Sequence, residues 1–169
     1  VSQSWDEGTG RFRNNPSSSN GVTWQMRTDT GSAAPAIWAT SSFATNATAT
    51  LTFSDKPNEA TTIALTDADG TTLTFETDND NNGVVGSNIA LDPAANSGAG
   101  MATELFNEVN GESSLAITAT NPSSGVVTLT MDTSGTSGNT SITTNMNNVS
   151  GDTTSFTGGS ATNSTGSSH

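Results

Sequence analysis

The stretch DNDNNG, residues 78–83, carries the side chains of this sequence that are best suited to chemistry. Asp78, Asp80 and Asn82 fall at alternate positions, and Gly83 follows them. The calcium loop of an EF-hand begins with this spacing, and carboxylate and amide oxygens are ligands that calcium binds. The spacing therefore leaves two alternatives, a cation site and a polar turn.

The second half of a calcium loop is missing. Its twelfth position supplies a bidentate Glu, but counting from Asp78 that position is Ile89. The preceding segment TLTFET, residues 72–77, alternates like a strand, so the helix that precedes an EF-hand loop is missing too. We therefore interpret the stretch as an Asn/Asp turn first. The alternative is a weak calcium site that Asp67 or Asp69 completes from the neighbouring turn.

Other kinds of catalytic site have few residues to use. The only histidine is His169, Cys and Tyr do not occur, and no Lys follows Lys56. A Ser–His–Asp triad, a Cys–His pair and a histidine zinc site are thereby excluded. Acidic side chains remain, in predicted turns or on the outer face of a predicted helix (Asp67, Asp69, Asp78, Asp80, Glu104 and Glu108). A glycosidase needs one of its two carboxylates in an apolar pocket, so we expect no enzymatic activity and no cofactor other than the calcium alternative.

Aromatic anchors are concentrated near the N-terminus. All three tryptophans lie in residues 1–46 (Trp5, Trp24 and Trp38). Breaks rich in Gly, Asn and Ser interrupt this region, which predicts an irregular arm or subdomain with short strands at 22–27 and 36–40. Tryptophan is a preferred anchor of small cores and of interfaces, and we assign these three that role. A platform on which sugars stack is the alternative.

Charge is distributed unevenly along the chain. All four basic residues lie in the first 56 positions, where four acids balance them. From Pro57 onward there are twelve acids and no base, so this part carries the whole net charge of −12. Binding to phosphate or to anionic lipid needs Lys or Arg. The sequence therefore predicts neither a nucleic-acid partner nor a membrane partner.

The elements that must position these residues are mostly strands. Ser, Thr and Asn make up 73 of the 169 residues and only 30% are hydrophobic, so any core must be thin. Apolar residues nevertheless recur at every second position from about residue 47 to 158, with Thr between them. This period predicts strands with one buried and one solvent-exposed face, and DADG at 67–70 and NPSSG at 121–125 predict hairpins. The predicted fold is mainly β (α+β), a Thr-rich antiparallel sheet or sandwich.

One segment of this β-rich domain has a helical period instead. Residues 98–110 carry apolar side chains at helical spacing, with Ser97 as N-cap and Gly111 as the residue that follows the helix. We expect this amphipathic helix to cover the apolar face of the sheet. Short strands are expected near Ile89, Ile142 and Phe156, and a flexible Gly/Ser tail over 159–169.

The order of motifs resembles a known family. TTIALTDADGTTLTFETDND, AGMATELFNEVN, GNTSI and TTSFTGG follow one another between about residues 48 and 160. The hairpin containing DG and TFE, the GNTSI turn at 138–142 and the terminal FTGG at 156–159 carry the resemblance. This set is similar to a small β-rich domain of structural proteins of tailed bacteriophages, often marine ones, found in tail, fibre and capsid-surface components.

The resemblance implies a non-enzymatic structural protein of the virion, an extracellular particle. The chain would assemble in many copies as a capsid decoration or as a tail or fibre component, with copies of itself and other virion proteins as partners. The alternative is a secreted or fibre-tip adhesin that binds carbohydrate through Trp24 or Trp38, with calcium at residues 78–82.

Overall fold

The computed structural model divides the chain into two units. It describes residues 2–6, 11–15, 22–26, 37–93 and 96–164, and it describes side chains from Phe43 to Thr162 except at positions 94, 95 and 122. The first unit comprises residues 1–44 and 161–169, and the second comprises Thr45–Ser160. Since both ends of the chain belong to the first unit, the second unit is an insertion between two strands of the first.

The described residues of the first unit form a five-stranded sheet in the order β13-β4-β3-β1-β2. Its strands are β1 (Ser2–Asp6), β2 (Arg11–Asn15), β3 (Val22–Met26), β4 (Ile37–Ser42) and β13 (Asn163–Ser164). All neighbours are antiparallel except β1 and β3, which run parallel. The sequence predicted β3 and β4 within an otherwise irregular region, whereas β1 and β2 carry too few apolar residues to show the period. The predicted tail begins with structure, because Gly159 and Ser160 belong to the second unit and β13 pairs with β4.

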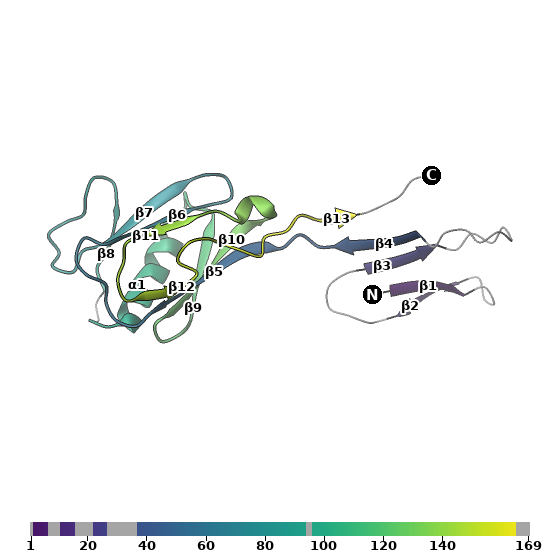
Figure 1. Cartoon of the computed structure of the whole chain (residues 1–169), viewed down its shortest axis with the longest axis horizontal. Coiled ribbons are helices and arrows are strands. Elements are labelled where there is room, and N and C mark those ends of the chain that lie inside the picture. The colour runs from purple at the N-terminus through teal and green to yellow at the C-terminus, as the bar shows by residue number, and fades with distance from the viewer. Residues whose placement is uncertain (1, 7–10, 16–21, 27–36, 94–95, 165–169) are drawn as a thin grey trace. The chain divides into compact units, whose positions relative to one another are not determined.

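The second unit holds two four-stranded sheets and one α-helix (Figure 1). Its elements are β5 (Asn46–Phe53), β6 (Thr62–Thr66), β7 (Thr72–Thr77), β8 (Ile89–Leu91), α1 (Gly98–Gly111), β9 (Ile117–Ser123), β10 (Val126–Ser134), a short 3-10 helix (Thr136–Gly138), β11 (Ile142–Thr144) and β12 (Val149–Gly151). The sheets have the orders β12-β5-β10-β9 and β11-β6-β7-β8. Both predicted hairpins, β6–β7 and β9–β10, are confirmed as antiparallel pairs. One pair departs from the predicted antiparallel sheet, because β8 runs parallel to β7.

The alternating residues form the core of this unit, as the period predicted. In β5 every second residue is buried, from Ala47 to Phe53, while the residues between them are exposed or half-buried. Apolar residues of both sheets and of α1 belong to one buried cluster, with Phe75 and Phe156 as its largest fully buried side chains. Threonines occupy much of the outer face. The mainly β fold is therefore confirmed, and a thin core is sufficient because each strand contributes to it from one face.

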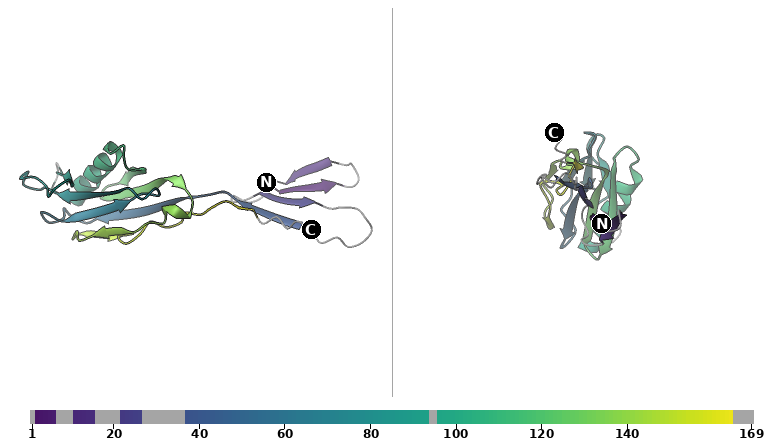
Figure 2. Two further views of the ribbon diagram at one scale, coloured as in Figure 1. Left: turned by 90° about the horizontal axis from the view of Figure 1, so that it is seen from above. Right: turned by 90° about the vertical axis from the view of Figure 1, so that its right-hand side faces the viewer.

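Helix α1 lies over the strands of this unit (Figure 2). It contacts β5, β8, β9 and β10 and buries its apolar stripe against them. The predicted N-cap is confirmed, because the hydroxyl of Ser97 accepts a hydrogen bond from the N–H of Gly100 at 3.1 Å. Gly111, predicted to follow the helix, is instead its last residue, and the N–H of Glu112 donates to the carbonyl of Val109. In the described part of the chain, no helix has the length and apolar character required to cross a membrane.

The last segment of the unit links its two sheets along one side. Ser155 forms a bridge with Ser141, next to β11 of one sheet. Thr157 forms a bridge with Thr48, which lies in β5 of the other sheet. The predicted strand near Phe156 is thus a run of single bridges between the sheets, which holds the Phe156 side chain in the core.

Two asparagine side chains form the same pair of hydrogen bonds with a backbone N–H and C=O group that a neighbouring strand would form. The amide of Asn110 on α1 donates to the carbonyl of Ala119 at 3.1 Å and accepts from its N–H at 2.9 Å. The amide of Asn139 makes the same two bonds with Gly159, at 3.0 and 2.9 Å. These bonds satisfy backbone groups for which no strand partner is at hand. These two asparagines therefore have a structural role.

Candidate functional site

Residues 78–83 form a turn that Asp78 organises. The Asp78 side chain is only 3% exposed, and its carboxylate accepts hydrogen bonds from the N–H of Asn82 at 2.9 Å and of Gly83 at 3.2 Å. Asn81 and Gly83 have φ values of 56° and 97°, a left-handed region that Asn and Gly tolerate best. The flanking elements are β7 and β8, and Ile89 is the first residue of β8. The predicted turn is therefore present, between strands and not between helices.

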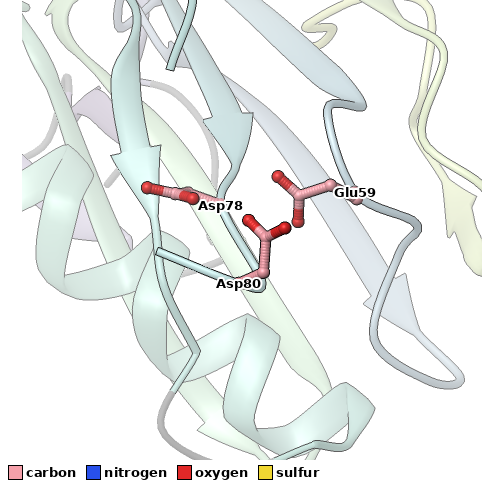
Figure 3. A group of neighbouring side chains, drawn as sticks. All are labelled: Glu59, Asp78 and Asp80. Carbon is pink, nitrogen blue, oxygen red and sulfur yellow. The ribbon is translucent and has the colours of Figure 1, made fainter. Parts of the chain in front are cut away.

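A third carboxylate joins this turn from another part of the chain. One oxygen each of Glu59, Asp78 and Asp80 lie within 4.8 Å of one another, the one such acidic, His or Cys group among the described residues. Figure 3 shows the carboxylates of Glu59 and Asp80 facing each other, while the Asp78 side chain extends away from them. Glu59 and Asp80 are exposed and Asp78 is buried. Oxygen ligands of this kind suit Ca²⁺, which takes six to eight of them.

Glu59 was missed by the sequence analysis, which considered Asp67 and Asp69 as partners of the turn. Those two residues follow β6, whereas Asp78 follows β7, so they lie at opposite ends of the same hairpin. The register of that hairpin indicates that Glu59 lies beside the turn. Thr62 pairs with Glu76, so the residues just before β6 must lie beside those just after β7, and the N–H of Asn79 indeed donates to Glu59.

Asn82, the third residue of the proposed calcium pattern, is exposed and serves the turn. Its backbone N–H bonds to Asp78, and its side-chain amide donates to a carboxylate oxygen of Asp80 at 2.9 Å. This contact uses an amide N–H and engages one of the two carboxylate oxygens of Asp80. The structure therefore brings Asp78 and Asp80 together with Glu59, and Asn82 is a neighbour whose side-chain amide donates to Asp80.

Asp67 has a different task, at the opposite end of the hairpin. Its side chain is 1% exposed, and its carboxylate accepts from the N–H of Asp69 at 3.0 Å, of Thr71 at 2.8 Å and of Ala116 at 3.0 Å. Burial acts to raise the pKa of Asp67, but the hydrogen bonds from Ala116, Thr71 and Asp69 outweigh it and leave the pKa below its usual value. Asp67 is thus a charged structural group that joins the β6–β7 turn to the segment before β9.

Glu76 fastens the other end of the loop that follows β7. Its side chain is buried, and one of its oxygens accepts from the N–H of Val85 at 3.1 Å and from the amide of Asn88. Together with the Asp78 bonds, these contacts fix both halves of the loop. Val85 at its tip is nevertheless 71% exposed.

Glu104 on α1 is the described acid whose pKa is raised. Burial is the main cause, and the neighbouring charges of Glu108 and Asp92 add to it, whereas a hydrogen bond from the N–H of Asp92 acts to lower the pKa. All three side chains keep contact with solvent, since Asp92 is exposed and the two glutamates are half-buried. Repulsion from its neighbours thus helps to raise the pKa of Glu104, as in a carboxylate pair. A general acid also requires an apolar pocket, whereas Glu104 keeps contact with solvent.

The three tryptophan side chains lie outside the part of the chain whose side chains the structure describes, but the strand register places the residues. Trp5 is paired with Phe12, and Gln3, two residues before Trp5, is paired with Trp24. Paired residues share a face, as do residues two apart in a strand, so Trp5 and Trp24 lie on the same face of the sheet. Trp38 is paired with Gln25, which places it on the opposite face.

Comparison with known proteins finds no matching family model, no matching curated protein and no matching solved structure.

Proposed function

We propose that this chain is a non-enzymatic structural protein of a tailed-bacteriophage virion, used in many copies as a capsid-surface decoration or as a tail or fibre component. The order of motifs over residues 48–160 motivates the biological setting. The proposed partners are further copies of the chain and other virion proteins, and the proposed location is the extracellular particle. Neither nucleic acid nor membrane is a proposed partner, because the net charge is −12.

The use of the buried carboxylates supports a structural role. Asp67, Glu76 and Asp78 are the acidic side chains among the buried polar residues, and each accepts hydrogen bonds from two or three groups of its own or a neighbouring loop. Catalysis by paired carboxylates requires a buried acid with free oxygens and a raised pKa. The carboxylates of these three acids instead accept hydrogen bonds that stabilise turns and loops, as is typical of residues with a structural role.

Quantitative mass spectrometry of purified particles tests this proposal. We expect the chain to copurify with intact particles of the phage that encodes it, in a fixed stoichiometry of many copies relative to the major capsid protein. Gold-labelled antibody should then assign it to capsid, tail or fibre. Absence of the chain from washed particles would overturn the proposal.

The Glu59–Asp78–Asp80 group favours a second candidate, a calcium-assisted adhesin that binds glycans. Three carboxylate oxygens within 4.8 Å of one another repel unless a cation or protons intervene. A bound Ca²⁺ would remove that repulsion and stabilise the folded state in proportion to its occupancy. The tryptophans support this candidate less, because Trp24 and Trp38 do not share a face of the sheet.

Thermal unfolding with and without Ca²⁺ separates the two candidates. The adhesin proposal expects the Tm to rise with Ca²⁺, and the rise to disappear in Glu59→Gln and Asp80→Asn, each of which keeps an oxygen for its present hydrogen bond. Asp69→Asn, in an exposed turn at the other end of the hairpin, is the matched control. No Tm shift in the unaltered chain, together with a glycan array without hits, would remove this candidate.

A further inference from the structure

The chain contains three Asn–Gly dipeptides, and the structure describes two of them. They are Asn82–Gly83, in the loop between β7 and β8, and Asn110–Gly111, at the end of α1. Asn20–Gly21 lies outside the described residues. An asparagine that precedes glycine is chemically labile, because glycine has no side chain to shield its backbone nitrogen from the asparagine side chain. At these dipeptides the chain can therefore change its own covalent structure.

The reaction converts the asparagine into an acidic residue. The backbone nitrogen of the glycine loses its proton to water or hydroxide and attacks the Cγ atom of the asparagine. A bond between these two atoms forms, the Cγ–Nδ2 bond breaks, and Nδ2 takes up a proton and leaves as ammonia. Water then opens the resulting ring at either carbonyl, which leaves aspartate or its isomer with the backbone running through the side-chain carbonyl. Water is the only co-reactant, and no electrons are exchanged.

The fold holds Asn110 away from this reaction. Its Oδ1 accepts a hydrogen bond from the N–H of Ala119 at 2.9 Å, and its Nδ2 donates to the carbonyl of the same residue at 3.1 Å. Gly111 is the last residue of α1, and the N–H of a helical residue is directed to the carbonyl four positions earlier. Ring closure at Asn110 therefore requires the end of the helix and its contact with β9 to open first.

Asn82 is less constrained. It lies outside helices and strands, and both Asn82 and Gly83 are exposed. Among the described residues, the Asn82 amide takes part in one hydrogen bond, from its nitrogen to Asp80. Gly83 has a φ of 97°, and a Cβ atom added there would meet nothing within 4 Å. The space around the attacking nitrogen is therefore open.

One contact opposes the reaction at Asn82. The N–H of Gly83 donates to both oxygens of Asp78, at 3.2 and 3.3 Å. These bonds are longer than the 2.9 Å bond that the N–H of Asn82 makes with the same carboxylate, and longer than the about 2.9–3.0 Å most common for N–H···O bonds. The attacking nitrogen of Gly83 is thus held more loosely than the Asn110–Gly111 dipeptide is held by α1 and β9.

We propose that Asn82 is a site of spontaneous deamidation, and that the fold directs this modification to Asn82 in preference to Asn110. The product adds one negative charge to the net charge of −12. It also replaces the amide that donates to Asp80 by a carboxylate, so an attractive contact becomes a repulsive one beside Glu59 and Asp78. The loop between β7 and β8 then loses local stability as the protein ages. This inference is independent of the proposed function, because it concerns the chemistry of the chain itself.

Peptide mapping of the full chain after incubation at mildly alkaline pH, which favours loss of the proton from the backbone nitrogen, tests the proposal. Cleavage after glutamate separates the two asparagines into fragments 77–104 and 109–112, and tandem mass spectrometry locates the modified residue. We expect Asn82 to convert at least about tenfold faster than Asn110, because two side-chain hydrogen bonds must break before Asn110 can react. Equal rates, the opposite order, or no conversion at Asn82 would overturn the proposal.

The same measurement in concentrated urea shows whether the fold sets the difference. In the unfolded chain neither dipeptide keeps its contacts, and the two should convert at similar rates. A difference that persists unchanged in urea would mean that neighbouring sequence selects Asn82, and would overturn the role of the fold. Asn82→Gln is the negative control, because its longer side chain would have to close a larger ring and position 82 should then stay unmodified.

Asn82→Asp measures what the modification does to the loop. This variant has the charge of the product without the reaction, and we expect the N–H of Gly83 to exchange its hydrogen faster than in the unaltered chain. Asn107→Asp is the control, because it adds the same charge at an exposed position of α1 and should leave exchange at Gly83 unchanged. Unchanged exchange at Gly83 in Asn82→Asp would overturn the expected loss of local stability.

Discussion

The inserted unit and the unit that flanks it in the sequence differ in how many layers their described residues form. In Thr45–Ser160, two sheets and α1 enclose one core, and Asn110 and residues 153–160 engage backbone groups at the margins of the sheets. The described residues of the flanking unit form one five-stranded sheet. A low hydrophobic content is therefore compatible with a stable fold when the apolar residues are concentrated on one face of each strand.

The largest effect should come from the core of the inserted unit. Phe75 is fully buried, and Phe75→Ala should lower the free energy of unfolding by about 3–5 kcal/mol through lost burial and the cavity left behind. Leu73→Ala in the same strand removes a half-buried side chain and should cost clearly less. Urea denaturation measures both. Equal costs for the two variants would mean that the core is not where this unit obtains its stability.

The next effect concerns a buried charge of the inserted unit. Asp67→Ala leaves the N–H groups of Asp69, Thr71 and Ala116 without their acceptor and should cost about 1–3 kcal/mol. Asp69→Ala, at an exposed position of the same turn, should change stability little. A loss in Asp67→Ala no greater than in the control would contradict the structural role of this carboxylate.

The same carboxylate should make stability depend on pH. The pKa of Asp67 is lowered in the folded state, so its contribution is present above the unfolded pKa of 3.8 and is lost as the pH falls below it toward the folded pKa. Urea denaturation measures the free energy of unfolding at each pH. Between about pH 6 and about pH 3 we expect this free energy to fall less in Asp67→Asn than in the unaltered chain. Glu104 acts in the opposite direction, because its raised pKa favours folding at low pH and the contribution is lost as the pH rises through the folded pKa.

A smaller effect should follow from opening a strand edge of the inserted unit. Asn110→Ala removes both hydrogen bonds to Ala119 and should cost about 1–2 kcal/mol. Asn107→Ala, at an exposed position on the same helix, should be neutral or slightly stabilising because Ala is the better helix former. Hydrogen exchange at Ala119 should quicken in the first variant only; unchanged exchange there would show that Asn110 does not protect this edge.

Local patterns predicted much of the inserted unit. The two-residue period identified β5, β6, β7, β9 and β10, and the helical period identified α1 with its cap at Ser97. Strand β8 was expected near Ile89, but its parallel pairing with β7 was not, because a three-residue strand carries no signal of direction. Glu59 was missed because it is distant in sequence from the turn, although the hairpin register would have placed it there.

The sequence by itself determined the strand period, the helix, the turn chemistry of residues 78–83 and the separation of charge, because these depend on neighbours within a few positions. Only the tertiary structure decided which distant groups meet. It placed Glu59 beside Asp80, used Asn110 to pair with Ala119, and separated Trp38 from Trp5 and Trp24 by the face of a sheet. The physical reason is that strand register and the path of the chain between strands fix these contacts, and both result from packing of the whole unit.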